Sequence, residues 1–159
     1  MKKKFFLLLL FFFSTVVCAQ EAPIPRFASL RSDKINLRAG PGERFPIEWV
    51  YECKNLPVEI IDAYEHWYKI KDYENIQGWM HKKMVSKKRY VLTPKGKKMP
   101  VYKKADISSP IIAYFDGQAV VQIVKCKKDS SFCLVSYNDW KGYIERTDLF
   151  GLYPKEEIK

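Results

Sequence analysis

Short runs in which apolar and polar residues alternate recur along this chain. Ile35 and Leu37 share one face of such a run, and Asn36 and Arg38 share the other. The run ends at Gly40-Pro41-Gly42, whose residue types supply the backbone angles of a chain reversal. The stretch therefore predicts a short strand that leads into a tight turn.

The same pattern predicts short strands along both halves of the chain. In the first half they span residues 27–31, 35–37, 48–51, 58–63, 67–71 and 77–81. In the second half they span residues 99–102, 111–115, 119–126, 132–137 and 142–144. Short strands separated by turn residues are typical of small β-barrels, and at most one helical turn is expected near 83–85 and near 147–149. The chain is therefore predicted to be all-β.

The two halves also repeat each other weakly. Gly78-Trp79-Met80 matches Gly142-Tyr143-Ile144 at an offset of 64 residues, and Trp67 matches Phe132 at an offset of 65. A nearly constant offset between separated apolar landmarks argues for two copies of a unit of about 60 residues. We assign the first unit to residues 27–91 and the second, more degenerate unit to residues 92–153.

Alternation predicts a small core in each unit. The inward positions of the first unit are Leu37, Val58, Ile60, Tyr68, Ile70, Met80 and Val85. Those of the second unit are Val101, Val120, Cys133, Val135, Ile144 and Leu149. The link between the units is short, and it is apolar at residues 90–92. We therefore expect a strand at residues 90–92 and two units that pack together.

The first 19 residues have the features of a secretory signal peptide. Lysines at positions 2–4 precede an apolar run over residues 5–13, and cleavage is expected after Ala19. The run is too short to span a bilayer. A retained N-terminal anchor and lipidation at Cys18 are the alternatives, although the bulky Val17 argues against lipidation. We expect a protein that is exported to the periplasm or secreted, and that is not transmembrane after cleavage.

Export would also change the charge and the cysteine content. Cleavage removes three of the 28 basic residues and none of the 18 acidic ones, so 25 basic and 18 acidic residues leave a net charge of +7. Cys126 and Cys133 flank a polar segment between two apolar runs, which is the layout of a hairpin that a disulfide could join. Cys53 would remain as a free, partly buried thiol, with intermolecular pairing or redox chemistry as alternatives.

The first unit resembles a known family. Residues 36–41, Asn-Leu-Arg-Ala-Gly-Pro, are similar to the Asn-x-Arg-x-Gly-Pro signature of bacterial SH3-like (SH3b) domains, and residues 56–60, 67–70 and 78–81 continue the resemblance. The resemblance implies two tandem small SH3-like β-barrels that serve as binding modules. It is looser in the second unit, where Pro100 and Tyr102 take the places of Asn36 and Arg38.

Few residues could support catalysis. His66 and His81 are the only histidines, and neither a Gly-x-Ser-x-Gly nor a His-Glu-x-x-His motif occurs. His66, His81 and Cys53 lack the spacing of zinc ligands, and nothing in the sequence marks Cys53 as an activated nucleophile. We therefore expect no enzyme, no metal site and no cofactor.

Two tryptophans and the signature pair are the candidates for ligand binding. Trp67 and Trp79 alternate away from the inward positions, and exposed aromatic residues grip sugars and extended peptides in binding modules. Packing under a loop or sealing the unit is the alternative. The resemblance implies that Asn36 and Arg38 partly fix the turn, Asn36 by bonding backbone and Arg38 by bracing a neighbouring loop or carboxylate. A ligand site that depended on this pair would exist only in the first unit.

Basic residues are densest between the two units. Lys82, Lys83, Lys87, Lys88 and Arg89 could attract an anionic envelope surface, with an ordinary solvated face as the alternative. No aromatic RNA-recognition motif occurs, so no nucleic-acid partner is expected.

These observations favour a non-catalytic exported module that recognises peptidoglycan or another envelope component. The alternative function is a periplasmic adaptor or structural protein that contacts other proteins and has no small-ligand pocket. Both follow from the resemblance and from the paucity of catalytic groups.

Overall fold

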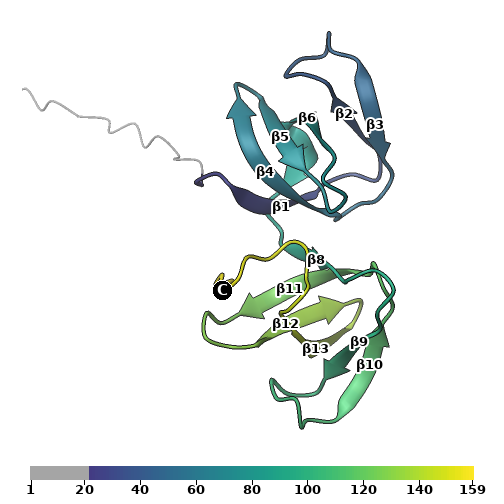
Figure 1. Ribbon diagram of the computed structural model, residues 1–159, viewed down its shortest axis with the longest axis vertical. Coiled ribbons are helices and arrows are strands. Elements are labelled where there is room, and N and C mark those ends of the chain that lie inside the picture. Colours follow the sequence, from purple (N-terminus) through teal and green to yellow (C-terminus); the bar gives the residue numbers. More distant parts are fainter. Residues whose placement is uncertain (1–21) are drawn as a thin grey trace, which may run out of the picture.

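The computed structural model describes residues 22–159, so the signal peptide expected at residues 1–19 lies outside the described part. The first sheet contains β1 (Arg26–Leu30), β2 (Ile35–Arg38), β3 (Ile47–Tyr51), β4 (Pro57–Tyr64), β5 (Trp67–Lys71), β6 (Gln77–His81) and β7 (Val85–Ser86). The second contains β8 (Tyr90–Leu92), β9 (Met99–Tyr102), β10 (Ile111–Phe115), β11 (Val120–Cys126), β12 (Phe132–Tyr137) and β13 (Trp140–Glu145). A short 3-10 turn, η1 (Lys82–Met84), follows β6. The predicted all-β fold is confirmed (Figure 1).

The second sheet repeats the strand order of the first. The orders are β3-β2-β6-β5-β4-β1-β7 and β10-β9-β13-β12-β11-β8. Each strand from β9 to β13 has the same neighbours as its counterpart, and β8 takes the place of β1 but has no partner that corresponds to β7. Within residues 22–159, no pairing joins the two outermost strands of either sheet. Each unit is therefore a curled sheet whose outermost strands do not pair with each other, which is consistent with the predicted SH3-like fold.

A glycine at the same place in each unit lets two strands approach closely. A Cβ atom on Gly78 would lie 2.6 Å from Cγ of Leu37, and one on Gly142 would collide with Cγ1 of Val101. Leu37 and Val101 are the matching inward residues of β2 and β9. Both units therefore use the same glycine to pack β6 or β13 against the core.

Each sheet encloses its own core, and the expected inward residues are buried with one exception. Val120 is half-buried and packs against the first core, whereas Val121 and Ile123 point into the second. A register shift between Ile123 and Lys125 explains the difference, because it reverses the alternation ahead of Cys126. The prediction for Val120 was wrong because alternation alone does not reveal a bulge.

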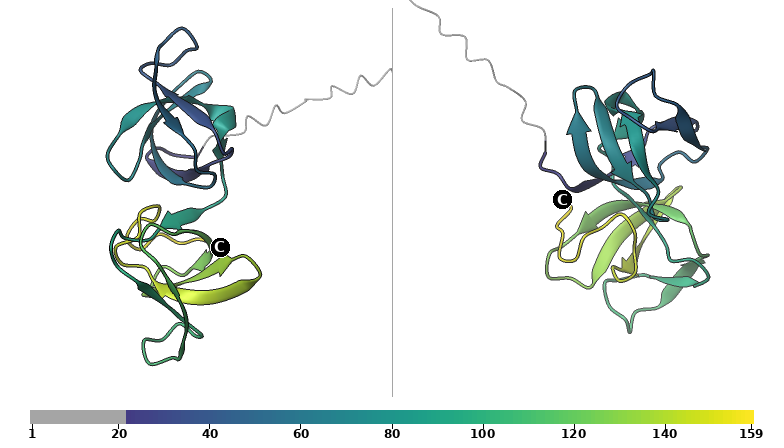
Figure 2. Two further views of the ribbon diagram at one scale, coloured as in Figure 1. Left: turned by 90° about the vertical axis from the view of Figure 1, so that its right-hand side faces the viewer. Right: turned by 45° about the horizontal axis from the view of Figure 1, so that its top comes forward.

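Strand β8 joins the two units, as predicted for residues 90–92 (Figures 1 and 2). It belongs to the second sheet, so the change of sheet falls between Ser86 and Tyr90. Val91 is buried in the second core, and the next residue, Leu92, is buried in the first. Successive side chains of β8 are therefore buried in different cores, and this strand links the two units.

Aromatic side chains fill the rest of the contact between the units. The ring of Phe27 lies 5.2 Å from that of Phe150 and 4.6 Å from that of Tyr153, measured between centroids. The hydroxyl of Tyr153 donates a hydrogen bond of 2.7 Å to Oε1 of Glu59, which is only 8% exposed. Lys71 pairs with the other oxygen of Glu59. The C-terminal segment is thereby held against the first sheet.

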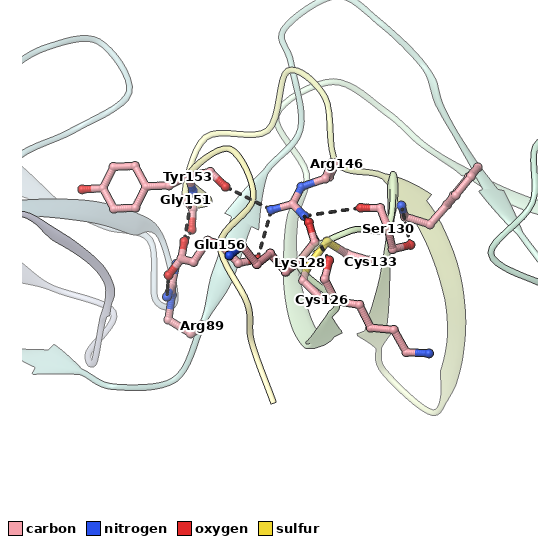
Figure 3. The surroundings of a disulfide bond; sticks show 11 residues. Arg89, Cys126, Lys128, Ser130, Cys133, Arg146, Gly151, Tyr153 and Glu156 are labelled. Atoms are coloured by element: carbon pink, nitrogen blue, oxygen red, sulfur yellow. Dashed lines mark hydrogen bonds and ion pairs between the residues drawn. A yellow bond between two sulfur atoms is a disulfide. The ribbon is translucent and has the colours of Figure 1, made fainter.

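The predicted disulfide between Cys126 and Cys133 is confirmed, and it joins directly opposed residues of β11 and β12 (Figure 3). Closing so short a loop contributes about 2.5 kcal/mol on the chain-entropy estimate. The adjoining turn is also held by Arg146, whose guanidinium donates to the carbonyl oxygens of Lys127 and Ser130. The disulfide and the hydrogen bonds of Arg146 therefore both hold the end of this hairpin in place.

Acid should weaken the contact between the units. Burial acts to raise the pKa values of Glu59 and Glu156, but hydrogen bonds to the carboxylates have a larger, opposite effect, so both pKa values are lowered. Glu59 accepts hydrogen bonds from Lys71 and Tyr153. Glu156 accepts hydrogen bonds from Arg89 and from the backbone of Tyr153. The two carboxylates therefore stabilise the folded protein fully above their unfolded-state pKa of about 4.3. This stabilisation is lost as the pH falls through their lower folded-state pKa values. Thermal unfolding measured between about pH 6 and pH 3 should show this loss.

The matched control is the double variant Glu59→Gln and Glu156→Gln. Its unfolding temperature should depend less on pH in the same window. An unchanged dependence would show that other carboxyl groups govern acid unfolding.

No helix in residues 22–159 is long and apolar enough to cross a membrane.

Candidate functional site

An open groove of about 570 Å³ lies on the outer face of the first unit. Residues from the start of β2, the turn after it, the start of β5, the end of β6 and η1 line it. They are Lys34, Ile35, Asn36, Arg38, Glu43, Trp67, His81, Lys83 and Met84. The groove therefore brings together four of the residues predicted to bind a ligand: Asn36, Arg38, Trp67 and Lys83.

Arg38 shapes one end of the groove. Its Nη1 atom donates hydrogen bonds to the carbonyl oxygens of Glu43, at 3.0 Å, and Phe45, at 2.7 Å. This is the loop-bracing role that the family resemblance implied. Asn36 is exposed, and no side-chain hydrogen bond of Asn36 occurs within residues 22–159, so its predicted bond to the backbone was wrong. Its amide is instead free to face a ligand.

Trp67 and two histidines form an aromatic cluster at the other end. Trp67 and His81 are opposite one another on β5 and β6, and their rings meet edge to face with centroids 5.5 Å apart. The ring of His66 stacks on that of His81 at 6.2 Å. Trp67 is half-buried, so part of its ring remains accessible in the groove.

His81 also positions the lysine beside it. Its Nδ1 atom accepts a hydrogen bond of 3.1 Å from the backbone N–H of Lys83, which caps η1. A ring nitrogen that accepts carries no proton, so in the neutral ring the proton is on Nε2. His81 therefore offers a hydrogen-bond donor at Nε2 and holds Lys83 at the groove wall.

The charge of the groove is predominantly positive. Lys34, Arg38 and Lys83 are cationic, whereas Glu43 is the one acidic residue among those that line it. An aromatic surface next to cationic and amide donors suits a ligand that combines an apolar or sugar face with a carboxylate.

The same place in the second unit is nearly filled. The corresponding groove measures about 120 Å³, and its lining includes Pro100, Glu145 and Asp148 at the positions of Asn36, His81 and Met84. Tyr102, which replaces Arg38, is buried, and its ring packs edge to face on Phe132, the counterpart of Trp67. The packed pair of Tyr102 and Phe132 therefore takes the positions that Arg38 and Trp67 hold beside the open groove of the first unit.

The remaining predicted residues lie outside the groove. Trp79 is half-buried in β6, where it pairs with Arg38 and Lys69 on neighbouring strands. Nζ of Lys82 lies 5.0 Å from the centroid of the Tyr68 ring. Lys87 and Lys88 are exposed in the link between the units.

Arg89 does not belong to an exposed basic patch, and that prediction requires correction. Its guanidinium makes a bidentate ion pair with Glu156 and donates a hydrogen bond of 2.7 Å to the carbonyl of Gly151 (Figure 3). These bonds tie the C-terminal segment to the link between the units. Arg89 thus has a structural role that its neighbours in sequence gave no reason to expect.

Sequence reasoning missed five residues of the groove: Lys34, Ile35, Glu43, His81 and Met84. Lys34 immediately precedes the signature strand, and Met84 ends the turn after β6. Glu43 follows the Gly40-Pro41-Gly42 turn, which carries it over the groove. Proximity to the signature was the one available signal for Lys34 and Glu43.

Cys53 lies apart from the two histidines. It is exposed and lines a different groove, which runs beside β3. Burial, and then the charge of Asp33, raise the pKa of its thiol, which is the opposite of what activates a nucleophile. No cluster of three or more potential metal ligands occurs among residues 22–159.

The bacterial SH3 domain family matches residues 31–87. Two solved structures are similar over 82% of this chain: NlpC2 from Trichomonas vaginalis, at 14% identity and a TM-score of 0.36, and NlpC1 from the same organism, at 13% identity and a TM-score of 0.36. The chain spans 49% and 47% of those two chains, respectively. No curated protein matches the sequence. The family match includes β2 to β7 and every residue that lines the 570 Å³ groove, so residues 31–87 form a bacterial SH3 domain.

Proposed function

We propose that this chain is a non-catalytic, exported module whose first unit binds peptidoglycan in the groove beside Trp67. The observation that carries the proposal is the composition of this groove. It places an accessible tryptophan next to His81, Asn36 and the cationic residues Arg38 and Lys83.

Peptidoglycan offers matching chemistry. Its sugar rings have apolar faces that can stack on an aromatic side chain, and its peptide stems carry carboxylates that lysine and arginine can bind. The positive groove also suits other anionic envelope polymers, but simple charge attraction would not require Trp67. The involvement of Trp67 therefore separates groove binding from attraction to a basic surface.

The arrangement of the histidines is compatible with the proposed binding role. In neutral His81, Nδ1 already accepts the Lys83 backbone N–H, and its neighbours are the rings of His66 and Trp67.

Replacing Trp67 by alanine should reduce the retention of the mature protein on purified peptidoglycan by about 10-fold or more, since stacking of one aromatic ring typically contributes 1–3 kcal/mol. Co-sedimentation at low and at high salt measures this effect. Retention by the unaltered protein should largely survive high salt, because stacking is not screened.

Two control variants sharpen the experiment. Tyr114→Ala removes an exposed aromatic side chain from the second unit and should leave retention unchanged. The double variant Lys87→Ala and Lys88→Ala tests the exposed basic link. Retention that vanishes in salt and in this double variant would replace the groove by the basic surface as the site.

The adaptor function remains the second candidate, and one observation favours it. Large apolar side chains are exposed on the outermost strands, β3 and β10, including Trp49 and Tyr114. Absence of any retention on peptidoglycan would favour this role.

A further inference from the structure

A second groove, of about 240 Å³, follows the free edge of β3. Its lining includes the consecutive residues Trp49 to Cys53, which means that it runs along the strand and not across it. β3 is the outermost strand of the first sheet, and within residues 22–159 it pairs with β2 alone (Figure 1). The hydrogen-bonding groups on its outer edge are therefore unpaired by any strand.

The opposite wall comes from both units. The turn between β5 and β6 contributes Tyr73 and Glu74, and the second unit contributes Leu92, Gln118 and Val120. Two of the lining residues are joined to each other, because the hydroxyl of Tyr51 donates a buried hydrogen bond of 2.9 Å to Asp72. A groove of this kind exists only where the two units meet.

The exposed edge is strongly apolar. Ile47, Trp49 and Val50 are 47%, 49% and 38% exposed, respectively, although β-strand residues of this size are usually covered. An exposed strand edge that carries apolar side chains is a template for pairing with another strand. Such an edge is usually protected, so its persistence here indicates a binding surface.

The charge of this groove is opposite to that of the protein as a whole. The chain has a formal net charge of +10, but the ionisable side chains that line the groove include Glu52, Asp72 and Glu74 and no lysine or arginine. Burial, and then the charges of Glu74 and Asp72, raise the pKa of Tyr73 in this groove. A partner that enters this groove must therefore be apolar or basic.

We propose that the free edge of β3 accepts an extended, basic segment of a partner protein as an additional strand. Main-chain hydrogen bonds to the edge would provide affinity, an apolar side chain of the segment would pack on Trp49, and its lysine or arginine side chains would pair with Glu52 and Glu74. This is strand addition to an exposed sheet edge, with specificity set by alternate side chains. The surface is distinct from the Trp67 groove.

A second copy of this chain is a poor occupant of the same edge. Two β3 strands placed edge to edge would bring together Glu48 and Glu52 of both copies, and like charges directly opposite one another destabilise a strand pair. The charge of the groove thus selects a partner other than β3 itself.

The test uses the mature protein and a short fluorescent peptide of alternating lysine and valine. Fluorescence anisotropy should show saturable binding, and hydrogen exchange of the β3 amides should slow when the peptide is present. A peptide of the same length that alternates glutamate and valine should bind at least about 10-fold more weakly, which corresponds to 1.4 kcal/mol. An N-methylated lysine–valine peptide, which lacks alternate N–H donors, should also lose affinity.

Charge variants locate the site. The double variant Glu52→Lys and Glu74→Lys should weaken binding at least about 10-fold, again 1.4 kcal/mol, with unfolding temperature unchanged. The double variant Glu65→Lys and Glu157→Lys makes the same change of charge at other exposed positions and should bind normally. Trp67→Ala should also bind the peptide normally, so failure of the peptidoglycan proposal and failure of this one are distinguishable.

Several results would overturn the inference. They are equal binding of the glutamate peptide, undiminished binding of the N-methylated peptide, protection that maps outside β3, and self-association through β3 in sedimentation. Absence of saturable binding by the lysine–valine peptide would also reject it.

Discussion

Replacement of Asp72 by alanine is expected to lower the free energy of unfolding by about 3 kcal/mol or more. Asp72 is 2% exposed, and its carboxylate accepts hydrogen bonds from the Tyr51 hydroxyl and from the backbone N–H groups of Glu74 and Ile76. Alanine would leave three donors without their acceptor in a largely buried place. Urea unfolding of the variant and the unaltered protein measures the difference.

The hydroxyl of Tyr51 makes the experiment more informative. Burial, followed by the hydrogen bond to Asp72, raises the pKa of Tyr51 well above its usual range, so the hydroxyl remains protonated and continues to donate. Asp72→Asn retains an acceptor for the backbone groups and should cost less than alanine. A double-mutant cycle with Tyr51→Phe should yield a coupling free energy between about 0.5 and 3 kcal/mol. Equal losses for Asn and Ala, with no coupling, would reject this account of the turn.

Replacement of Arg146 by alanine should cost about 3 kcal/mol as well. Its guanidinium donates to carbonyl oxygens on both sides: Lys127 and Ser130 in the disulfide-bonded hairpin, and Tyr153 and Glu156 in the C-terminal segment (Figure 3). Hydrogen bonds to a charged donor are stronger than neutral ones, and several are lost together. The variant should unfold at a lower denaturant concentration, with faster hydrogen exchange at residues 127–130 and 153–158.

The matched control is Lys141→Ala, which removes an exposed cation from β13 and should leave stability unchanged. Arg146→Lys retains the charge but not the planar set of donors, so it should recover only part of the loss. Full recovery by lysine would mean that charge alone, and not the set of bonds to carbonyl oxygens, accounts for the role of Arg146.

The strands could be predicted from sequence because the period-two pattern is strong and the turns are marked by Gly, Pro, Asn and Asp. The Asn36-Leu37-Arg38 signature indicated the family that the first unit resembles. The two cysteines of the predicted hairpin indicated the disulfide. The pattern failed at Val120, where a bulge reverses the alternation, and β4 has a comparable register shift between Ile60 and Asp62. An irregularity of one residue leaves no trace in a pattern of apolar and polar positions.

The candidate site was only partly predictable. Trp67 and Arg38 were recognisable by outward position and signature, but which residues share a groove depends on strand order. Arg89 and Arg146 show the limit most clearly, because their partners are 67 and up to 19 residues away along the chain. Nothing local distinguishes either arginine from the many exposed lysines.

The comparison of the two units suggests how they differ in role. The groove is open where Arg38 braces its loop and closed where Tyr102 packs on Phe132. The second unit instead supplies β8, the aromatic contacts of Phe150 and one wall of the β3 groove. On our proposal, the first unit binds the envelope and the second unit supports it.

The most direct test is chemical-shift mapping by NMR, with soluble peptidoglycan fragments added to the mature protein. The proposal predicts perturbed amide resonances at residues 34–38 and 81–84 and at Trp67, including its indole N–H. It predicts no perturbation at the matching residues 98–102 and 145–148. Perturbations centred on the second unit or confined to Lys87 and Lys88, or no perturbation at all, would contradict it.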